Sequence, residues 1–479
     1  MVQMGFDDGM RAKTSPLLVA VDEEDPHRDS AAGDMPSFIT PVLVLSTFIA
    51  GCGSFCYGYA MGYSSPAQSG IMAEMGLSLA QYSIFGSIMT IGGMIGAIFS
   101  GKITDMFGRR RAMMLSAVAC IPGWLAITFA KDALWLEIGR MLIGFAVGVS
   151  SFVVPVYIAE IAPKQIRGRF TSINLLMTNY GFAVAFFMGN IISWRTLSLI
   201  AVFPCVVQLV GLFFIPESPR WLAKVGREKE VQGALQRLRG KKDIADIFQE
   251  ADDIREISEA FQPGKDANPL KLFQKKNAYP MIVVVGLMLL QQLGGISALA
   301  FYTSTVFTKA GFSTTIGSTS LSIMQIPVTL IAVLLMDAFG RRTLLMVSSA
   351  GACLSLLLVA VSFHLKELQY LDDLTPLLVF LGISGYVAAF GIGMGGIPWV
   401  LMSEILPIDV KASGGSIVTL TNWSVSWLIT YTFNFALEWN PASTFFFFAA
   451  MSLVAVFFTW KLVPETRGRT LEEIQQLCS

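Results

Sequence analysis

Asp105-Met-Phe-Gly-Arg-Arg110 recurs in the second half of the chain as Asp337-Ala-Phe-Gly-Arg-Arg342. Both copies stand where one long apolar segment ends and the next begins. A second echo keeps the same order, because Glu160-Ile-Ala-Pro163 is matched by Glu404-Ile-Leu-Pro407. A repeated charged turn between membrane helices predicts two similar bundles, and two bundles that rock about a shared site make a transporter.

The composition is that of a membrane protein. Of 479 residues, 54% are hydrophobic and 14% are charged, and the mean hydropathy is +0.61, whereas a soluble domain carries roughly a quarter charged residues. A membrane helix needs about 20 apolar residues, and twelve runs reach that length, near 38–60, 81–101, 112–130, 134–157, 170–190, 196–215, 279–303, 316–336, 343–364, 375–402, 413–436 and 443–463. The sequence therefore predicts an all-α polytopic protein with twelve transmembrane helices in two six-helix bundles.

The spacing of these runs divides the chain into five segments. We expect an N-terminal tail over 1–37, a six-helix bundle over 38–215, a linker with short helices over 216–276, a second bundle over 277–463 and a C-terminal tail over 464–479. If both termini are cytosolic, the only Lys and Arg of the outer loops are Lys131, Arg195, Lys309 and Lys366. The positive-inside rule predicts that orientation.

Several classes of function receive no support from the sequence. The net charge of zero suggests no nucleic-acid partner, and the six cysteines lack metal-type spacing. There is no P-loop pattern for ATP-driven pumping and no convincing nucleophile–base pair for catalysis. We expect a monomeric protein in a lipid bilayer that is not an enzyme and needs no cofactor or metal.

Charged residues gather at the predicted cytosolic boundary, where isolated charges are costly and should pair. Acids are interleaved with arginines, whose planar fork suits carboxylates; topology control by basic residues alone would not explain those acids. We expect a salt-bridge latch that holds the cytosolic ends together when the pore opens outward. Its predicted members are Asp105, Arg109, Arg110, Glu160, Arg167, Asp337, Arg341, Arg342 and Glu404, with Arg140 reaching the cluster from its span.

Polar and aromatic residues also interrupt the later spans, which predicts a polar site near the midplane. Amides that both donate and accept suit the hydroxyl edge of a sugar, and an indole suits its C–H faces. The alternative is hydrogen bonding between helices, and for Gln325 the two interpretations stay open. The candidate residues are Gln291, Gln292, Ser297, Tyr302, Gln325, Trp399, Asn422 and Trp423.

These motifs resemble the sugar porter family of the major facilitator superfamily over about 38–470. The resemblance rests on Gly101-x3-Asp105-x2-Gly-Arg-Arg110, Gly139-Arg140, Pro155-x4-Glu160, Pro216-Glu-Ser-Pro-Arg220, Gln291-Gln292-x2-Gly295, Pro398-Trp399-x4-Glu404 and Pro464-Glu-Thr-Arg-Gly468. Tyr63-Ser-Ser-Pro66 is most similar to plant monosaccharide transporters induced early in dehydration. The resemblance implies hexose transport by alternating access, with sugar bound mainly by the C-terminal half.

The chain departs from the family pattern at four positions. Leu175 and Gly391 stand where relatives carry a sugar-binding Gln and a Glu, and Ser297 replaces an Asn. Lys411 replaces an Arg of the latch, which keeps the charge and loses the fork. Weak affinity, another monosaccharide or a polyol would fit these departures.

The first span, from Phe38 to Ala60, contains no Asp, Glu or His, and family symporters typically place an Asp there. We therefore expect facilitated diffusion, with a proton-coupled sugar or polyol symporter as the alternative. A sugar sensor that scarcely transports is a further alternative, which the short tail over 469–479 disfavours. The resemblance favours the vacuolar membrane over the plasma membrane.

Overall fold

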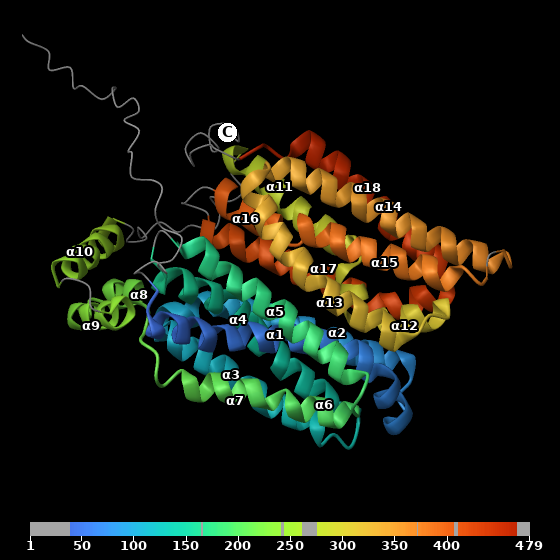
Figure 1. Ribbon diagram of the computed structural model, residues 1–479, viewed down its shortest axis with the longest axis horizontal. Helices are drawn as coiled ribbons and strands as arrows, with labels where there is room; N and C mark the ends of the chain where they lie inside the picture. Colours follow the sequence, from blue (N-terminus) through green and yellow to red (C-terminus); the bar gives the residue numbers. More distant parts are fainter. Residues whose placement is uncertain are drawn as a thin grey trace, which may run out of the picture. The chain divides into compact units, whose positions relative to one another are not determined.

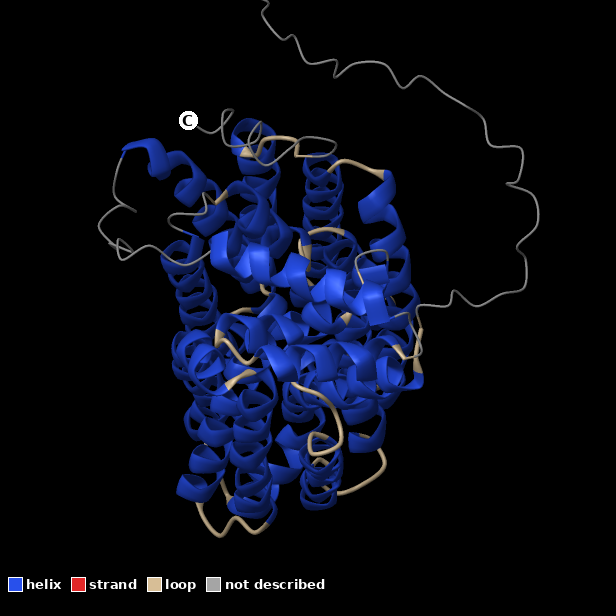
Figure 2. Ribbon diagram, turned by 90° about the vertical axis from the view of Figure 1, so that its left-hand side faces the viewer, coloured by secondary structure: helices blue, strands red, loops and turns tan. Residues whose placement is uncertain are grey.

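The computed structural model describes residues 39–163, 166–240, 244–260, 275–370, 372–406 and 411–466, without the side chains of 244–246, 257–260, 275–276, 333, 336–338, 403 and 411–413. The chain divides into a unit Met1–Ile39, of which Ile39 alone is described, and a unit Thr40–Ser479, to which everything below refers. Figure 2 shows that the described part of the chain contains helices and loops and no strand.

Seven helices make up the N-terminal half: α1 (Pro41–Met75), α2 (Leu79–Phe107), α3 (Arg109–Thr128), α4 (Ala133–Ile161), α5 (Arg167–Gly189), α6 (Trp194–Ile200) and α7 (Val202–Gly211). The side chains of Thr40, Ser78, Asp132 and Ser193 each accept a hydrogen bond from a first-turn N–H. These caps fix where α1, α2, α4 and α6 begin.

Glycines allow α2 to lie directly against α4. A methyl group at position 92, 96, 144 or 148 would run into the facing backbone. This is the small-residue packing that membrane helices use for close approach.

Three shorter helices follow: α8 (Pro219–Lys224), α9 (Glu228–Arg239) and α10 (Ile244–Ala260). Val231, Leu235 and Leu238 recur at helical spacing and form the buried face of α9. Arg239 donates to the Ile161 carbonyl at the end of α4, and Thr40 donates to the Leu238 carbonyl. The group is therefore attached to the N-terminal half. We call this end of the bundles the linker end and the opposite end the far end (Figure 1).

The C-terminal half contains α11 (Lys275–Leu293), α12 (Ile296–Ala310), α13 (Thr314–Ala338), α14 (Arg341–Glu367), α15 (Thr375–Ile392), α16 (Ile397–Ile405), α17 (Lys411–Trp439) and α18 (Pro441–Leu462). Two expected single spans, 279–303 and 375–402, are each two helices. The first breaks at Gly294–Gly295, where Gly295 has φ +87°, a left-handed conformation that favours glycine. The second breaks between Gly393 and Gly396. Pro398 lies in the first turn of α16 and does not break it.

Eleven helical stretches of the described chain are long and apolar enough to cross a membrane. α17 is not among them, although it is 29 residues long. Its interior carries Asn422, Ser424, Ser426 and Asn434, and these side chains lower its hydropathy. The span expected over 413–436 is therefore present as a helix with an unusually polar interior.

The two halves meet along three helix pairs: α1 with α12, α2 with α17, and α5 with α13. At the far end Ser65 bonds to Ser304 over 2.8 Å, Thr305 donates to Gln68 over 2.6 Å, and Asn190 donates to Ser318 over 3.0 Å. The cross-half hydrogen bonds that we find among the described residues lie at the far end or at mid-depth.

Candidate functional site

The break between α11 and α12 places two glutamine side chains inside the C-terminal half. The Gln291 amide nitrogen donates to the Met394 carbonyl at 2.5 Å, beside the second helix break. Its oxygen accepts from Asn422 Nδ2 of α17 at 2.9 Å. Two of the predicted site residues thus bind each other, and the unwound backbone at Met394 completes the set.

Gln292 belongs to a second, neighbouring group. Its oxygen accepts from the Ser297 hydroxyl at 2.6 Å, and Ser297 also pairs with Ser426 of α17 at 2.8 Å. Gln291 and Gln292 are only 4% and 7% exposed. The helix break therefore brings Gln291, Gln292 and Ser297 next to the polar face of α17.

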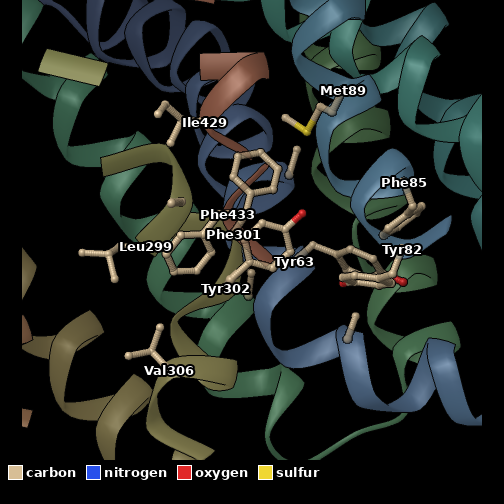
Figure 3. Close-up of a cluster of buried hydrophobic side chains, with 14 of the residues drawn as sticks. Tyr63, Tyr82, Phe85, Met89, Leu299, Phe301, Tyr302, Val306, Ile429 and Phe433 are labelled. Atoms are coloured by element: carbon tan, nitrogen blue, oxygen red, sulfur yellow. The ribbon is translucent and has the colours of Figure 1, made fainter. Parts of the chain in front are cut away.

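Tyr302 lies in an aromatic cluster that joins the two halves (Figure 3). Its ring stacks on Phe433 at a centroid distance of 5.7 Å and meets Tyr82 of α2 edge to face at 6.4 Å. Its hydroxyl group lies against Gly86 of α2 and, among the described residues, has no hydrogen-bond partner. Its backbone is non-helical, with φ −134° and ψ 20°.

The two tryptophans occupy different surroundings. Trp423 crosses to the N-terminal half, where a methyl group added at Gly93 would lie 2.9 Å from its ring. Trp399 is half-buried in the first turn of α16 and packs on the apolar core of the C-terminal half. The structure does not join either indole to the amide groups by a hydrogen bond.

Gln325 lies apart from these residues, in the middle of α13. Its Nε2 donates to Asn179 Oδ1 of α5 at 3.1 Å, across the boundary between the halves. Asn179 is 8% exposed. Asn179 was not predicted from the sequence, because a single Asn in an apolar run ordinarily makes a helix–helix hydrogen bond.

The charged residues of the N-terminal half form a closed cluster at the linker end. Arg109 donates two hydrogen bonds of 2.8 Å to the Glu160 carboxylate, and Ser218 also donates to Glu160. The Glu217 carboxylate accepts from the backbone N–H groups of Arg109 and Arg110 at 3.1 Å, which caps α3. Burial raises the pKa of Glu217 above its ordinary value. Asp105 contacts Arg109 at 3.5 Å and Lys224 at 3.0 Å.

The C-terminal half repeats this arrangement with fewer contacts. Glu465 accepts from the N–H groups of Arg341 and Arg342 at 2.9 and 3.2 Å, as Glu217 does in the first half. Arg341 reaches Glu404 at 3.6 Å. The second carboxylate oxygen of Glu404 is buried and has no hydrogen-bond partner among the described residues. The acids Glu217 and Glu465 were not predicted as cluster members, although the echo of Pro216-Glu-Ser in Pro464-Glu-Thr marks both.

Arg140 corrects one expectation, because the structure does not bring it to the linker end. It stands two turns from the far-end start of α4, and twenty residues of helix, about 30 Å, separate it from Glu160. Arg140 is fully buried, donates to the Ala60 carbonyl and the Ser64 hydroxyl, and lies over the rings of Tyr63 and Phe85.

The structure describes fewer contacts for the remaining predicted members of the charged cluster. Arg167 stands at the linker end of α5, and its buried Nε has no hydrogen-bond partner among the described residues. Arg342 donates to the Trp460 carbonyl. The side chains of Asp337 and Lys411 lie outside the described part of the chain.

Comparison with known proteins decides the family. The profile described as "Sugar (and other) transporter" matches residues 4–478. The chain is 50% identical to "Sugar transporter ESL1" of Arabidopsis thaliana over 91% of its own length and 93% of the relative's. It is 49% identical to "Sugar transporter ERD6" of the same plant, over 92% and 88%. The chain belongs to the sugar transporter family.

The fold of this sugar transporter is that of the major facilitator superfamily. The inward-open structure of the xylose transporter XylE from E. coli matches with a TM-score of 0.77 at 23% identity, over 91% of this chain and 99% of that one. A structure titled "proton:xylose symporter XylE" bound to 6-bromo-6-deoxy-D-glucose matches with a TM-score of 0.74, also at 23% identity and over the same shares. The relatives are named transporters, so the chain is a plant ERD6-type sugar porter and not an enzyme.

Within the sugar transporter, one departure from the family pattern is offset nearby. Leu175, which replaces a family Gln, is 42% exposed and makes no polar contact. Asn179 follows one helical turn later, on the same side of α5. An amide is therefore available from the N-terminal half, one turn nearer the far end than the family pattern has it.

Proposed function

We propose that this sugar transporter carries a monosaccharide, in the first place a hexose, by alternating access and facilitated diffusion. The proposal of facilitated diffusion rests on the positions of the acidic residues. Every Asp and Glu in the bundle helices lies within four residues of a helix end. Proton coupling uses an ionisable group inside the membrane region, and these positions offer it no carboxyl group at mid-depth.

Arg140 supports the same proposal. It makes no ion pair among the described residues; a carbonyl, a hydroxyl group and two aromatic faces surround it instead. A proton that titrates a partner carboxylate would switch such an arginine between paired and unpaired states. Here the surrounding groups do not titrate near neutral pH, so the arginine stays in one state through the cycle.

Sugar binding is assigned to the amide groups beside the helix breaks. Gln291, Gln292 and Asn422 provide donors and acceptors for ring hydroxyl groups, and Ser297 and Gln325 add two further polar groups. Tyr302 and the indoles of Trp399 and Trp423 supply apolar walls for the C–H faces. In other transporter folds, discontinuous helices near the midplane likewise form the substrate site.

The charged clusters act as the latch of the outward-open state. In the present structure each cluster is closed within its own half, and the halves are joined by hydrogen bonds at mid-depth and the far end. Glu404 of the C-terminal half retains a buried oxygen without a partner, and Arg167 of the N-terminal half retains a buried N–H without one. Closing the linker end would allow such groups to pair, a rigid-body switch between two packings.

The same geometry supports the orientation that we propose, with both termini cytosolic. The proposal of the vacuolar membrane as host rests on the family resemblance alone. The linker end carries both charged clusters and the helices α8–α10, which contain six Lys and Arg residues. At the far end Arg195, Lys309 and Lys366 donate to helix carbonyl groups at Thr128, Leu437 and Lys309. Those three cations therefore have a capping role, and they do not argue against the positive-inside rule.

Uptake into proteoliposomes tests the transport proposal. Labelled glucose, fructose, xylose and inositol are offered with and without an inward proton gradient. We expect one hexose to equilibrate at a rate that a proton ionophore leaves unchanged. Accumulation that collapses with the ionophore would establish the symporter instead, and saturable binding without uptake would establish a sensor.

A distance measurement tests the latch. Spin labels on the linker ends of α5 and α16 report the ratio of inward-open to outward-open molecules. Glu404→Ala is expected to raise that ratio, and Glu438→Ala, an exposed acid near the far end of α17, should leave it unchanged. An unchanged ratio in Glu404→Ala would remove that residue from the latch.

A further inference from the structure

Three side chains at mid-depth form a hydrogen-bond chain between the halves. Asn179 is twelve residues from the linker-end start of α5, and Gln325 is eleven residues from the far-end start of α13. Asn179 Nδ2 donates to Thr329 Oγ1, and Gln325 Nε2 donates to Asn179 Oδ1 at 3.1 Å. Thr329 Oγ1 donates in turn to the Gln325 carbonyl at 2.8 Å.

The chemistry of these groups fixes the direction of every bond in the chain. The Thr329 hydroxyl has one proton, and it is used on the Gln325 carbonyl, so toward Asn179 the hydroxyl can only accept. Asn179 must therefore turn its NH₂ group to Thr329 and its oxygen to Gln325. An amide that meets an acceptor must present its NH₂ group, and so Gln325 points Nε2 at Asn179. The remaining polar atom of the Gln325 side chain is its oxygen.

The fixed directions of these hydrogen bonds point to a positioning role for Asn179. We propose that Asn179 presents the Gln325 amide to the sugar with its oxygen outward, so that the site selects a hydroxyl group that donates at this point. The inference rests on the proposed sugar-binding role of Gln325. Gln325 is half-buried while Asn179 and Thr329 are buried, so Gln325 is the member of the chain that a ligand can reach.

The arrangement also makes the selection depend on conformation. Asn179 belongs to the N-terminal half, and Gln325 and Thr329 belong to the C-terminal half. The amide of Gln325 is oriented only while α5 and α13 are adjacent, and it is free to turn over when they separate. A sugar whose hydroxyl group donates to the Gln325 oxygen therefore stabilises the joined seam.

The competing explanation is a plain seam contact, and the chain offers a matched control for it. Asn190 also joins α5 to α13, at the far end, through Ser318 at 3.0 Å and Thr319 at 3.4 Å. It touches neither Gln325 nor the other candidate site residues. Loss of a seam contact alone should change uptake of all sugars by one factor, in Asn190→Leu as in Asn179→Leu.

Monofluoro sugars separate the two explanations, because a C–F group cannot donate a hydrogen bond. KM is measured in proteoliposomes for D-glucose and for the series of monofluoro-D-glucoses, or for another monosaccharide and its fluoro analogues if that sugar is the one transported. In the native protein we expect one fluoro position to raise KM about tenfold, the value of one oriented hydrogen bond. In Asn179→Leu the Gln325 amide is free to turn, so that its NH₂ group can face the fluorine. The increase in KM that this fluorine causes should then be at most about threefold.

Two further results complete the test. Thr329→Val removes the acceptor that orients Asn179, and it should reduce the same fluorine penalty while Asn190→Leu leaves it intact. If Asn179→Leu and Thr329→Val both keep the native pattern of fluorine penalties, the inference is overturned and the proposed function stands. If the native protein takes up no monosaccharide, the proposed function fails, and the inference fails with it.

Discussion

Replacing Glu160 by Gln and, separately, Glu404 by Gln compares equivalent acids in the two halves. Glu160 binds Arg109 through two bonds of 2.8 Å, and the side chains are 12% and 11% exposed. Glu404 binds Arg341 at 3.6 Å, with the side chains 21% and 20% exposed. Removing the charge of a largely buried partner costs about 3 kcal/mol, and loss of the looser, more exposed pair costs about 1 kcal/mol.

These magnitudes predict unequal thermal shifts. With roughly 2–4 °C for each kcal/mol in a domain of this size, Glu160→Gln should lower Tm by roughly 6–12 °C and Glu404→Gln by roughly 2–4 °C. Unfolding of the detergent-solubilised transporter, followed by tryptophan fluorescence, measures both. Glu438→Gln is the control, with no shift expected. A fall in Tm for Glu404→Gln that equals or exceeds the one for Glu160→Gln would refute the reasoning from contact geometry.

Three other predictions concern single groups. Gly93→Ala places a methyl group 2.9 Å from the Trp423 ring and should slow uptake severalfold, whereas Gly101→Ala, on the same helix with nothing within 4 Å, should not; equal rates would contradict the close contact. Burial raises the pKa of Glu217, so the folded state binds this proton more tightly than the unfolded state does. Tm should therefore fall as the pH rises above 4.5, and Glu217→Gln should remove this dependence of Tm on pH. Measuring Tm over a series of pH values tests both expectations. Tyr302→Phe removes a buried hydroxyl group without a partner among the described residues, so Tm should hold or rise while KM for the sugar increases if the hydroxyl binds it; a clear drop in Tm would show a hidden partner.

Much of the fold could be predicted from the sequence, because helix formation in a bilayer depends mainly on the length and hydropathy of each run. The breaks at Gly294–Gly295 and Gly393–Gly396 could not be predicted in the same way. A glycine is compatible with both a continuous helix and a left-handed turn, and hydropathy does not report φ. These breaks are the features that place Gln291 and Ser297 beside Asn422.

Among the charged residues, too, some features could be predicted from the sequence and others could not. The repeat makes Arg109 and Glu160 equivalent to Arg341 and Glu404, and the structure shows both pairs in contact. Their role as a latch stays a prediction. Arg140 was misplaced, although the expected span over 134–157 and the outer position of Lys131 already put it near the outer end of that helix. Asn179 was missed because its partners are about 150 residues away in the chain, and pairing at that separation depends on how the two halves pack.

The hydrogen bonds among Gln291, Asn422 and the Met394 carbonyl are complete before any sugar arrives. A sugar hydroxyl group that binds Gln291 here competes with an existing internal partner, so part of the binding is an exchange reaction. An exchange of that kind has a small net free energy, about 1 kcal/mol or less for each bond, and a handful of such exchanges corresponds to millimolar dissociation constants. A transporter that binds its sugar so weakly would release it quickly on either side of the membrane. Its transport rate would increase with the concentration difference over a wide range before it saturated.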